Sequence, residues 1–142
     1  MDLEALAGLN WLAVITGAAL YFALGAIWFQ PQLLGRAWMR SIGWDPSRGQ
    51  PDASVVSYLP SLVAYLVAAT AVGLLAAATG SDNLAAGITL GLVIGIGLAL
   101  TLTAVDASFD PIKPHPWSWF AISGMYHLLG LLMVAVLVSV WG

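Results

Sequence analysis

Cysteine is absent from this chain of 142 residues, and charged residues are scarce. Without cysteine the chain has no disulfide, no thiolate nucleophile, no iron–sulfur cluster and no thiolate-bound metal. Only 8% of the residues are charged and 61% are hydrophobic, whereas a soluble domain has about 25% charged residues. The net charge of −3 gives no reason to expect nucleic acid as a partner. The composition therefore indicates an integral membrane protein whose immediate partner is the lipid bilayer.

Four apolar runs are long enough to cross a bilayer, for which a helix needs about 20 residues. Lipid offers the backbone no hydrogen bonds, and the runs lack the alternating pattern of barrel strands, so each run is expected to be a helix. The sequence predicts an all-α fold, a four-helix transmembrane bundle in a single domain covering residues 1–142. The predicted spans are residues 8–29, 55–79, 84–105 and 117–141.

The start of the chain and its second connection each carry a local signal. Asp2 and Glu4 precede the first run without a basic residue, whereas a secretory signal has a basic start, so the first run is expected to be a retained helix. The stretch GSDN at residues 80–83 is short enough for a hairpin and supplies polar side chains that can cap the third span. We therefore expect the second and third spans to be antiparallel neighbours.

All four basic residues lie in the first and third connections. The positive-inside rule places these connections in the cytoplasm and both termini outside. The termini and the hairpin contribute no lysine or arginine to the count. The basic residues are Arg36, Arg40, Arg48 and Lys113.

The first connection has the pattern of a short amphipathic helix over residues 31–43. Pro31 suits the first position of a helix, and positions about 100° apart then separate into an apolar and a basic side. This pattern is typical of a helix at the headgroup level whose arginines reach anionic lipid. A solvated loop with a chance pattern is the alternative. The apolar side holds Leu34, Trp38 and Ile42, and the other side holds Arg36 and Arg40.

The stretch GAIWFQPQLLGRAWM at residues 25–39 resembles the signature of a family of small bacterial membrane proteins, domain of unknown function 1761. The final run, ISGMYHLLGLLMVAVLVSVW, is similar to the closing helix of that family, with its Gly-x-Tyr-His centre. The resemblance implies the four-helix fold and a bacterial cytoplasmic membrane, and it implies no activity. The signature residues are Gly25, Trp28, Pro31, Gly35, Arg36, Trp38 and Met39.

Small residues repeat at every fourth position along the third run. Such a stripe forms a shallow groove that another helix can approach closely. A packing contact is the simpler interpretation, and a gating or substrate-lining role is the alternative. The stripe consists of Gly87, Gly91, Gly95, Ala99 and Thr103.

Asp106 lies near the cytoplasmic end of this stripe, within the arc that the small residues span. We therefore expect its side chain to point toward protein rather than lipid. A carboxylate in that place can cap the helix connection, pair with Lys113 or an arginine, or exchange protons.

His127 falls near the middle of the last run, where an ionisable side chain is costly and is a functional hypothesis by default. We expect it to face the bundle interior near the second span and to be neutral. Its structural interpretation is a hydrogen bond to a backbone carbonyl or to Tyr58, Tyr65 or Thr70. The functional interpretation makes His127 and its neighbour Tyr126 candidates for proton transfer or ligand binding.

No cofactor, metal site or catalytic set is evident. The other histidine, His115, is too far from His127 to share a ligand within one chain, and no carboxylate accompanies His127 in its span. The leading hypothesis is a non-enzymatic membrane protein that acts through helix packing, as a homo-oligomer or as an accessory subunit of a larger membrane complex. The alternative is a minimal transporter or channel with a pathway near His127. An enzyme acting on a lipid or quinone is a third hypothesis.

Overall fold

The computed structural model describes residues 4–51 and 54–141, and this part of the chain contains helices and loops but no strand. Asp2 lies outside the described residues. The all-α prediction is confirmed. The helices are α1 (Glu4–Ala7), α2 (Trp11–Trp28), α3 (Gly35–Ser41), η1 (Pro46–Arg48), η2 (Val55–Tyr58), α4 (Leu59–Thr79), α5 (Leu84–Ile94), η3 (Gly95–Leu100), α6 (Thr101–Phe109) and α7 (Pro116–Trp141).

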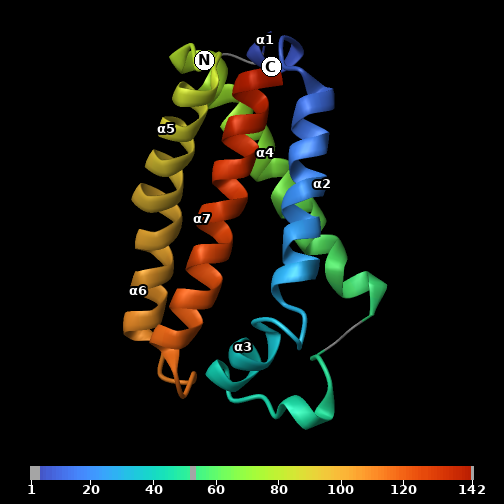
Figure 1. Cartoon of the computed structure of the whole chain (residues 1–142), viewed down its shortest axis with the longest axis vertical. Coiled ribbons are helices and arrows are strands. Elements are labelled where there is room, and N and C mark those ends of the chain that lie inside the picture. Colours follow the sequence, from blue (N-terminus) through green and yellow to red (C-terminus); the bar gives the residue numbers. More distant parts are fainter. Residues whose placement is uncertain (1–3, 52–53, 142) are drawn as a thin grey trace.

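Four of the resulting helices are long and apolar enough to cross a membrane. The first is α2, and the second joins η2 to α4 without a break. The third joins α5, η3 and α6 into one continuous helix, and the fourth is α7. The chain therefore forms a four-helix transmembrane bundle, with both ends of the described chain at one end of the bundle and α3 at the other (Figure 1).

The ends of the spans differ from the predicted limits by a few residues. The first span begins at Trp11 because the Asn10 side chain caps it, accepting a hydrogen bond from the Ala13 amide at 3.2 Å. Asn83 caps the third span in the same way, through the Ala86 amide at 3.0 Å. The third span runs on to Phe109, beyond the predicted residue 105.

Helix α7 is the centre of the bundle and packs against α2, α4 and the long α5–η3–α6 helix. Helices α4 and α5 follow each other through the hairpin, yet within the described residues they share no extended contact. The two helices are antiparallel, as expected, but they are not packed against each other along their length, so that part of the expectation was wrong, and each packs mainly on α7. A short hairpin sets only the antiparallel direction of two helices, while side-chain packing decides which faces meet.

Gly87, Gly91 and Gly95 of the third span lie directly against α7. A Cβ atom at Gly91 would be 2.7 Å from the Cα atom of Leu132, and one at Gly87 would be 2.9 Å from the Cα atom of Val136. Gly95 faces Leu128 at the next turn. The absence of side chains on this face is what allows the two helices to approach, as expected for small residues in a membrane.

The π-helical stretch η3 adjusts the direction of this stripe. In a regular α-helix, positions four residues apart drift by about 40° at each repeat. The wider turns of a π-helix rotate less per residue, which counteracts the drift. Ala99 and Thr103 accordingly remain half-buried. The Thr103 hydroxyl is close to Gly124 of α7, where an added Cβ would lie 3.3 Å from Oγ1.

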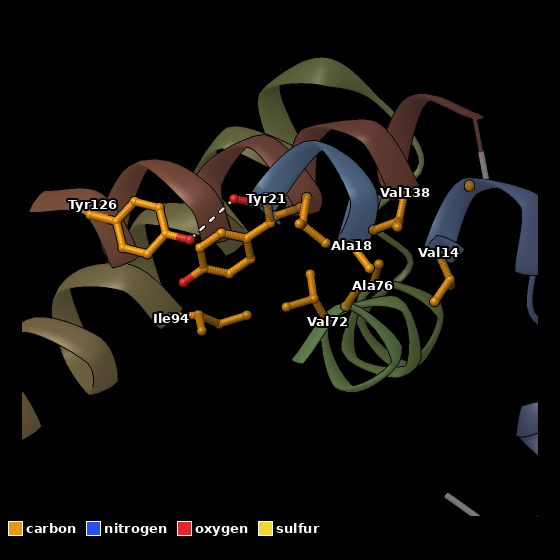
Figure 2. Close-up of a cluster of buried hydrophobic side chains, with 12 residues drawn as sticks. Val14, Ala18, Tyr21, Val72, Ala76, Ile94, Tyr126 and Val138 are labelled. Atoms are coloured by element: carbon orange, nitrogen blue, oxygen red, sulfur yellow. Dashed lines mark hydrogen bonds between the residues drawn. The ribbon is translucent and has the colours of Figure 1, made fainter. Parts of the chain in front are cut away.

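The buried core lies where α2 and α4 meet α7. Val14 and Tyr21 of α2, Val72 of α4, and Tyr126 and Val134 of α7 are almost completely buried. Figure 2 shows the cluster, with Tyr21 and Tyr126 side by side at one end of it. Most of the core is aliphatic, and its tyrosines lie toward the α3 end of α2.

Candidate functional site

The segment after α2 turns back beneath the bundle instead of forming one helix over residues 31–43. The Gly35 amide donates to the Gln30 carbonyl at 3.0 Å, so a tight turn containing Pro31 precedes the short helix α3. A Cβ atom at Gly35 would clash with the Phe29 carbonyl oxygen, which is backbone. The turn therefore requires a glycine here. The helix ends at Ser41, before Gly43 with its φ of 79°.

Helix α3 is amphipathic, as the sequence predicted. Arg36 and Arg40 are exposed, whereas Met39 is buried and Trp38 is half-buried. The ring of Trp38 packs edge-on against Phe29, with ring centroids 5.5 Å apart. Met39 is therefore the most buried apolar side chain of α3, at a position the predicted apolar side did not include.

A cavity of about 760 Å³ opens between α2, the η2–α4 helix and the α3 segment. This size falls in the range of small-molecule sites, which are mostly apolar with a few polar groups. We call it the aromatic cavity, because six aromatic side chains line it and none of the described lining residues is charged. The aromatic residues are Phe22, Phe29, Trp38, Tyr58, Tyr65 and Tyr126.

The lining of the aromatic cavity is more polar at one end than at the other. Tyr65 and Tyr126 line its inner part, beside the core, while Ser57 and Gln50 line the part nearest the α3 segment. The Gln50 side chain donates to the Phe29 carbonyl at 3.0 Å, which ties the connection to the end of α2. From residue 57 to residue 65 a helix rises about 12 Å. Aromatic rings line both ends, and serine and glutamine side chains are added only toward the outer end, about 12 Å from the inner one.

Four of the seven signature residues line this cavity: Gly25, Gly35, Trp38 and Met39. Gly25 leaves space for a tyrosine, because a Cβ atom there would be 2.8 Å from the Tyr126 hydroxyl oxygen. The signature residues Trp28, Pro31 and Arg36 have other places. The indole of Trp28 donates to the Ile122 carbonyl at 3.0 Å, Pro31 belongs to the turn, and Arg36 is exposed.

His127 is half-buried, and its partner is Tyr21 of α2. The Tyr21 hydroxyl lies 2.7 Å from Nδ1 of His127 and 3.4 Å from the His127 carbonyl oxygen. The expected partners on the second span, Tyr58, Tyr65 and Thr70, do not make this bond. That expectation was wrong because it searched α4 for a polar group, while Gly130 on α7 leaves space for the Tyr21 ring.

Tyr21 joins this pair to the aromatic cavity, and sequence reasoning missed it. Its ring stacks on Tyr65 with centroids 4.3 Å apart. Its carbonyl accepts a hydrogen bond from the Tyr126 hydroxyl at 3.1 Å, as Figure 2 shows. The available signal was a tyrosine in the middle of an otherwise apolar first span. His127 itself does not line the cavity, whereas Tyr126 does.

Asp106 is exposed on α6, so the expectation that it points toward protein was wrong. Near it on the same helix, Thr103 lies close to Gly124 of α7 and Ala107 is buried. Successive helical residues point about 100° apart, so Asp106 projects away from Ala107. Among the described residues no hydrogen bond or ion pair holds the Asp106 carboxylate. Lys113, one of its expected partners, pairs with Asp110 instead.

Two carboxylates outside the spans are shifted by local bonds. The pKa of Asp110 is lowered to about 2 by its hydrogen bond with the Lys113 side chain, together with the backbone amides of Lys113 and Ile112. The pKa of Asp45 is lowered because its carboxylate accepts from the Ser47 amide at 2.9 Å. These bonds order the two connections, and neither carboxylate lines the aromatic cavity.

No group of three or more histidine, aspartate or glutamate side chains that could hold a metal is present among the described residues. The side chains that the structure does bring together are aromatic rings, hydroxyls and one imidazole. Groups of these kinds can make apolar contacts and hydrogen bonds.

The four apolar helices, three of them packed around α7, make this a small multi-pass integral membrane protein. The chain matches the family described as "Protein of unknown function (DUF1761)" over residues 12–139, and it belongs to that family. The resemblance noted from residues 25–39 is thereby confirmed. No curated protein and no solved structure matches the chain.

Proposed function

We propose that this protein binds a small lipid-soluble molecule in the aromatic cavity. The observation that carries the proposal is an uncharged, aromatic-lined space of about 760 Å³ between α2, α3 and α4. Sites for small molecules are concave and mostly apolar, with few polar groups that set orientation. Four of the seven residues by which the chain resembles its family line the cavity, which supports a role beyond helix packing.

A role in assembly has less support. The glycines that suggested an oligomer, or a subunit of a larger membrane complex, contact α7 within one chain. A pathway near His127, as in a transporter or channel, also has less support, because His127 does not line the cavity. We therefore propose a binding protein without catalytic activity of its own.

The proposed location is the cytoplasmic membrane of a bacterium. The first and third connections, with their four basic residues, lie at the same end of the bundle (Figure 1). We propose that this end faces the cytoplasm and that both termini are outside, following the positive-inside rule. The aromatic cavity then opens in the cytoplasmic leaflet.

The test is to fill the cavity with a tryptophan side chain and to identify which bound compounds the purified protein retains. Ala26 of α2 lines the aromatic cavity, and Ala23, on the same helix, does not line it and is exposed. Ala26→Trp places a large ring in the cavity, and Ala23→Trp adds the same ring outside it. Each protein is purified in mild detergent, and the bound compounds are extracted and identified by mass spectrometry.

We expect one lipid-soluble compound to copurify with the wild type and with Ala23→Trp, and to be lost from Ala26→Trp. Unfolding by heat, followed by circular dichroism, checks that both variants are folded. The proposal is wrong if the set of extracted compounds is the same for all three proteins.

A further inference from the structure

The wall of the aromatic cavity is a connected series of rings. Phe29 packs edge-on against Trp38 on one side and against Tyr126 on the other, with centroids 5.5 Å and 5.1 Å apart. Tyr126 then packs edge-on against Tyr65 at 6.2 Å. Because these contacts fix the orientation of each ring, the wall is a rigid set of flat surfaces rather than a flexible aliphatic lining.

Contacts with Tyr21 fix the rings at the inner end of this wall. The Tyr65 ring stacks on Tyr21, whose hydroxyl is bonded to His127 at 2.7 Å. The Tyr126 hydroxyl donates to the Tyr21 carbonyl. These bonds leave the half-buried ring of Tyr65 as the exposed surface at the inner end, while Tyr126, which is only 2% exposed, supports it. A flat ring of a ligand gains contact here without any rearrangement of the wall.

No charged side chain among the described residues lines the cavity. The nearest basic residues in the chain point elsewhere: Arg36 and Arg40 are exposed on α3, and Arg48 lies 4.9 Å from the ring centre of Trp44. An ionised group brought into the cavity would lose its hydration without gaining a partner of opposite charge. The inner part of the ligand is therefore uncharged.

The outer end of the cavity is suited to a polar group. Ser57 and Gln50 line it there, near the α3 segment, where a membrane protein meets the headgroups, and Ser61 lies midway between this end and Tyr65. A polar end in this place can exchange hydrogen bonds with side chains and water. The distance from this end to the inner rings, about 12 Å, limits the length of the ligand.

From these observations we infer that the ligand is an uncharged amphiphile about 12 Å long, with a flat aromatic or conjugated ring at its inner end and a polar group at its outer end. The inference rests on the proposed function and narrows it. The inferred class excludes the acyl chains of ordinary lipids, which have no ring, and it excludes lipophilic ions.

The experiment uses four small probes that differ in one property at a time. Phenylhexanol has the inferred ring, length and polar end. Cyclohexylhexanol replaces the flat ring by a saturated one, while phenylhexanoate and phenylhexylamine are ionised at neutral pH. The full chain is placed in lipid nanodiscs, and its unfolding temperature is measured with each probe, because a ligand of the folded state raises that temperature. Ala26→Trp and Ala23→Trp are measured in parallel.

We expect phenylhexanol to raise the unfolding temperature of the wild type and of Ala23→Trp, but not that of Ala26→Trp. Cyclohexylhexanol should produce less than half of that shift, and the two ionised probes should produce none that depends on Ala26. If cyclohexylhexanol gave a shift equal to that of phenylhexanol, the inference that the ligand has a flat ring would be wrong. If either ionised probe gave an equal shift, the inference that the ligand is uncharged would be wrong.

The result separates this inference from the proposed function. If no probe gives a shift that depends on the cavity, the inferred class is wrong. The proposed function is then decided independently by the compounds that copurify with the wild type and with Ala26→Trp. If the same compounds copurify with the wild type and with Ala26→Trp, the proposed function and the inferred ligand class are both wrong.

Discussion

At the scale of single residues, Gly35 has the least space of the signature residues. A Cβ atom there would meet the Phe29 carbonyl oxygen and would lie 2.9 Å from the carbonyl carbon of Gln30. Backbone atoms in a tight turn cannot move aside as a flexible side chain can. We therefore expect Gly35→Ala to lower the free energy of unfolding by about 1–3 kcal/mol, the range for overpacked sites.

Gly97→Ala is the matched control for that measurement. Nothing lies within 4 Å of a Cβ atom at Gly97, and alanine favours a helix by up to about 1 kcal/mol over glycine. Both variants are unfolded in detergent and followed by circular dichroism. Equal stability of Gly35→Ala and the wild type would contradict the clash.

The pair of Tyr21 and His127 should behave as a coupled unit. His127→Gln keeps a donor and an acceptor and should leave the stability nearly unchanged. His127→Leu removes the imidazole partner of the Tyr21 hydroxyl and leaves it only the more distant carbonyl of residue 127. The loss with His127→Leu should be smaller in a Tyr21→Phe background. We expect a coupling energy of about 0.6 kcal/mol, the average for such bonds in a membrane protein. A double-mutant cycle of unfolding free energies measures it, and additive losses would mean that the bond contributes nothing.

Asp110 is the residue whose titration is easiest to observe. Its pKa of about 2 lies below the usual value of 3.8, chiefly because of the Lys113 side chain. Since the folded-state pKa is lowered, the stabilisation is complete above the unfolded value of about 4 and is lost as pH falls toward 2. Carboxyl ¹³C NMR should show this low midpoint, and Lys113→Ala should raise it. An unchanged midpoint in Lys113→Ala would contradict the ion pair.

At the scale of elements, the contact between α5 and α7 depends on the glycine stripe. Leucine at Gly91 would push its side chain into the backbone of α7, since even a Cβ atom would be 2.7 Å from the Cα atom of Leu132. We expect Gly91→Leu to separate the two helices and to lower the free energy of unfolding by at least about 1–3 kcal/mol. Thermal unfolding and near-ultraviolet circular dichroism in detergent measure the effect.

Gly97→Leu tests whether the loss of stability in Gly91→Leu comes from the position of the leucine rather than from the leucine itself. Gly97 is in the same span and has open space on its side. The Gly97→Leu variant should therefore have the same unfolding temperature as the wild type. If Gly91→Leu and Gly97→Leu were equally stable, α5 and α7 would not be packed through the stripe.

Elements also differ in how far the sequence predicted them. The spans followed from length and hydropathy, because lipid requires a helix of about 20 residues wherever the backbone crosses it. The amphipathic helix α3 was predicted from the spacing of its arginines, but its start was placed at residue 31 instead of Gly35. The carbonyl of Gln30 is used in the preceding turn, and that bond depends on how the chain leaves α2.

At the scale of the whole molecule, the arrangement of the ends gives a prediction of topology. A reporter enzyme that is active only outside the cytoplasm should be active when fused at Gly142 and inactive when inserted at Gly49, in the first connection. Gly49 is exposed and is suited to an insertion. The reason is that all four basic residues lie in the first and third connections. Activity only in the insertion at Gly49 would show that the protein has the opposite orientation.

The sequence by itself determined the class of the protein, the four spans and the membership of its family, because these depend on local properties: hydropathy, length and motif spacing. It also indicated Gly91 as a packing residue, since small side chains at a spacing of four share one face. Such features are visible without knowing which helices meet.

Only the tertiary structure decided which helices are neighbours and where a cavity lies. Tyr21 and His127 are 106 residues apart, and Gly25 and Tyr126 lie in the first and last spans. All four helices are strongly apolar, so hydropathy does not distinguish a face that packs on protein from one that faces lipid, and only the glycine stripe marks a packing face. Close packing around α7 makes that distinction, and the aromatic cavity is the space that it leaves between α2, α3 and α4.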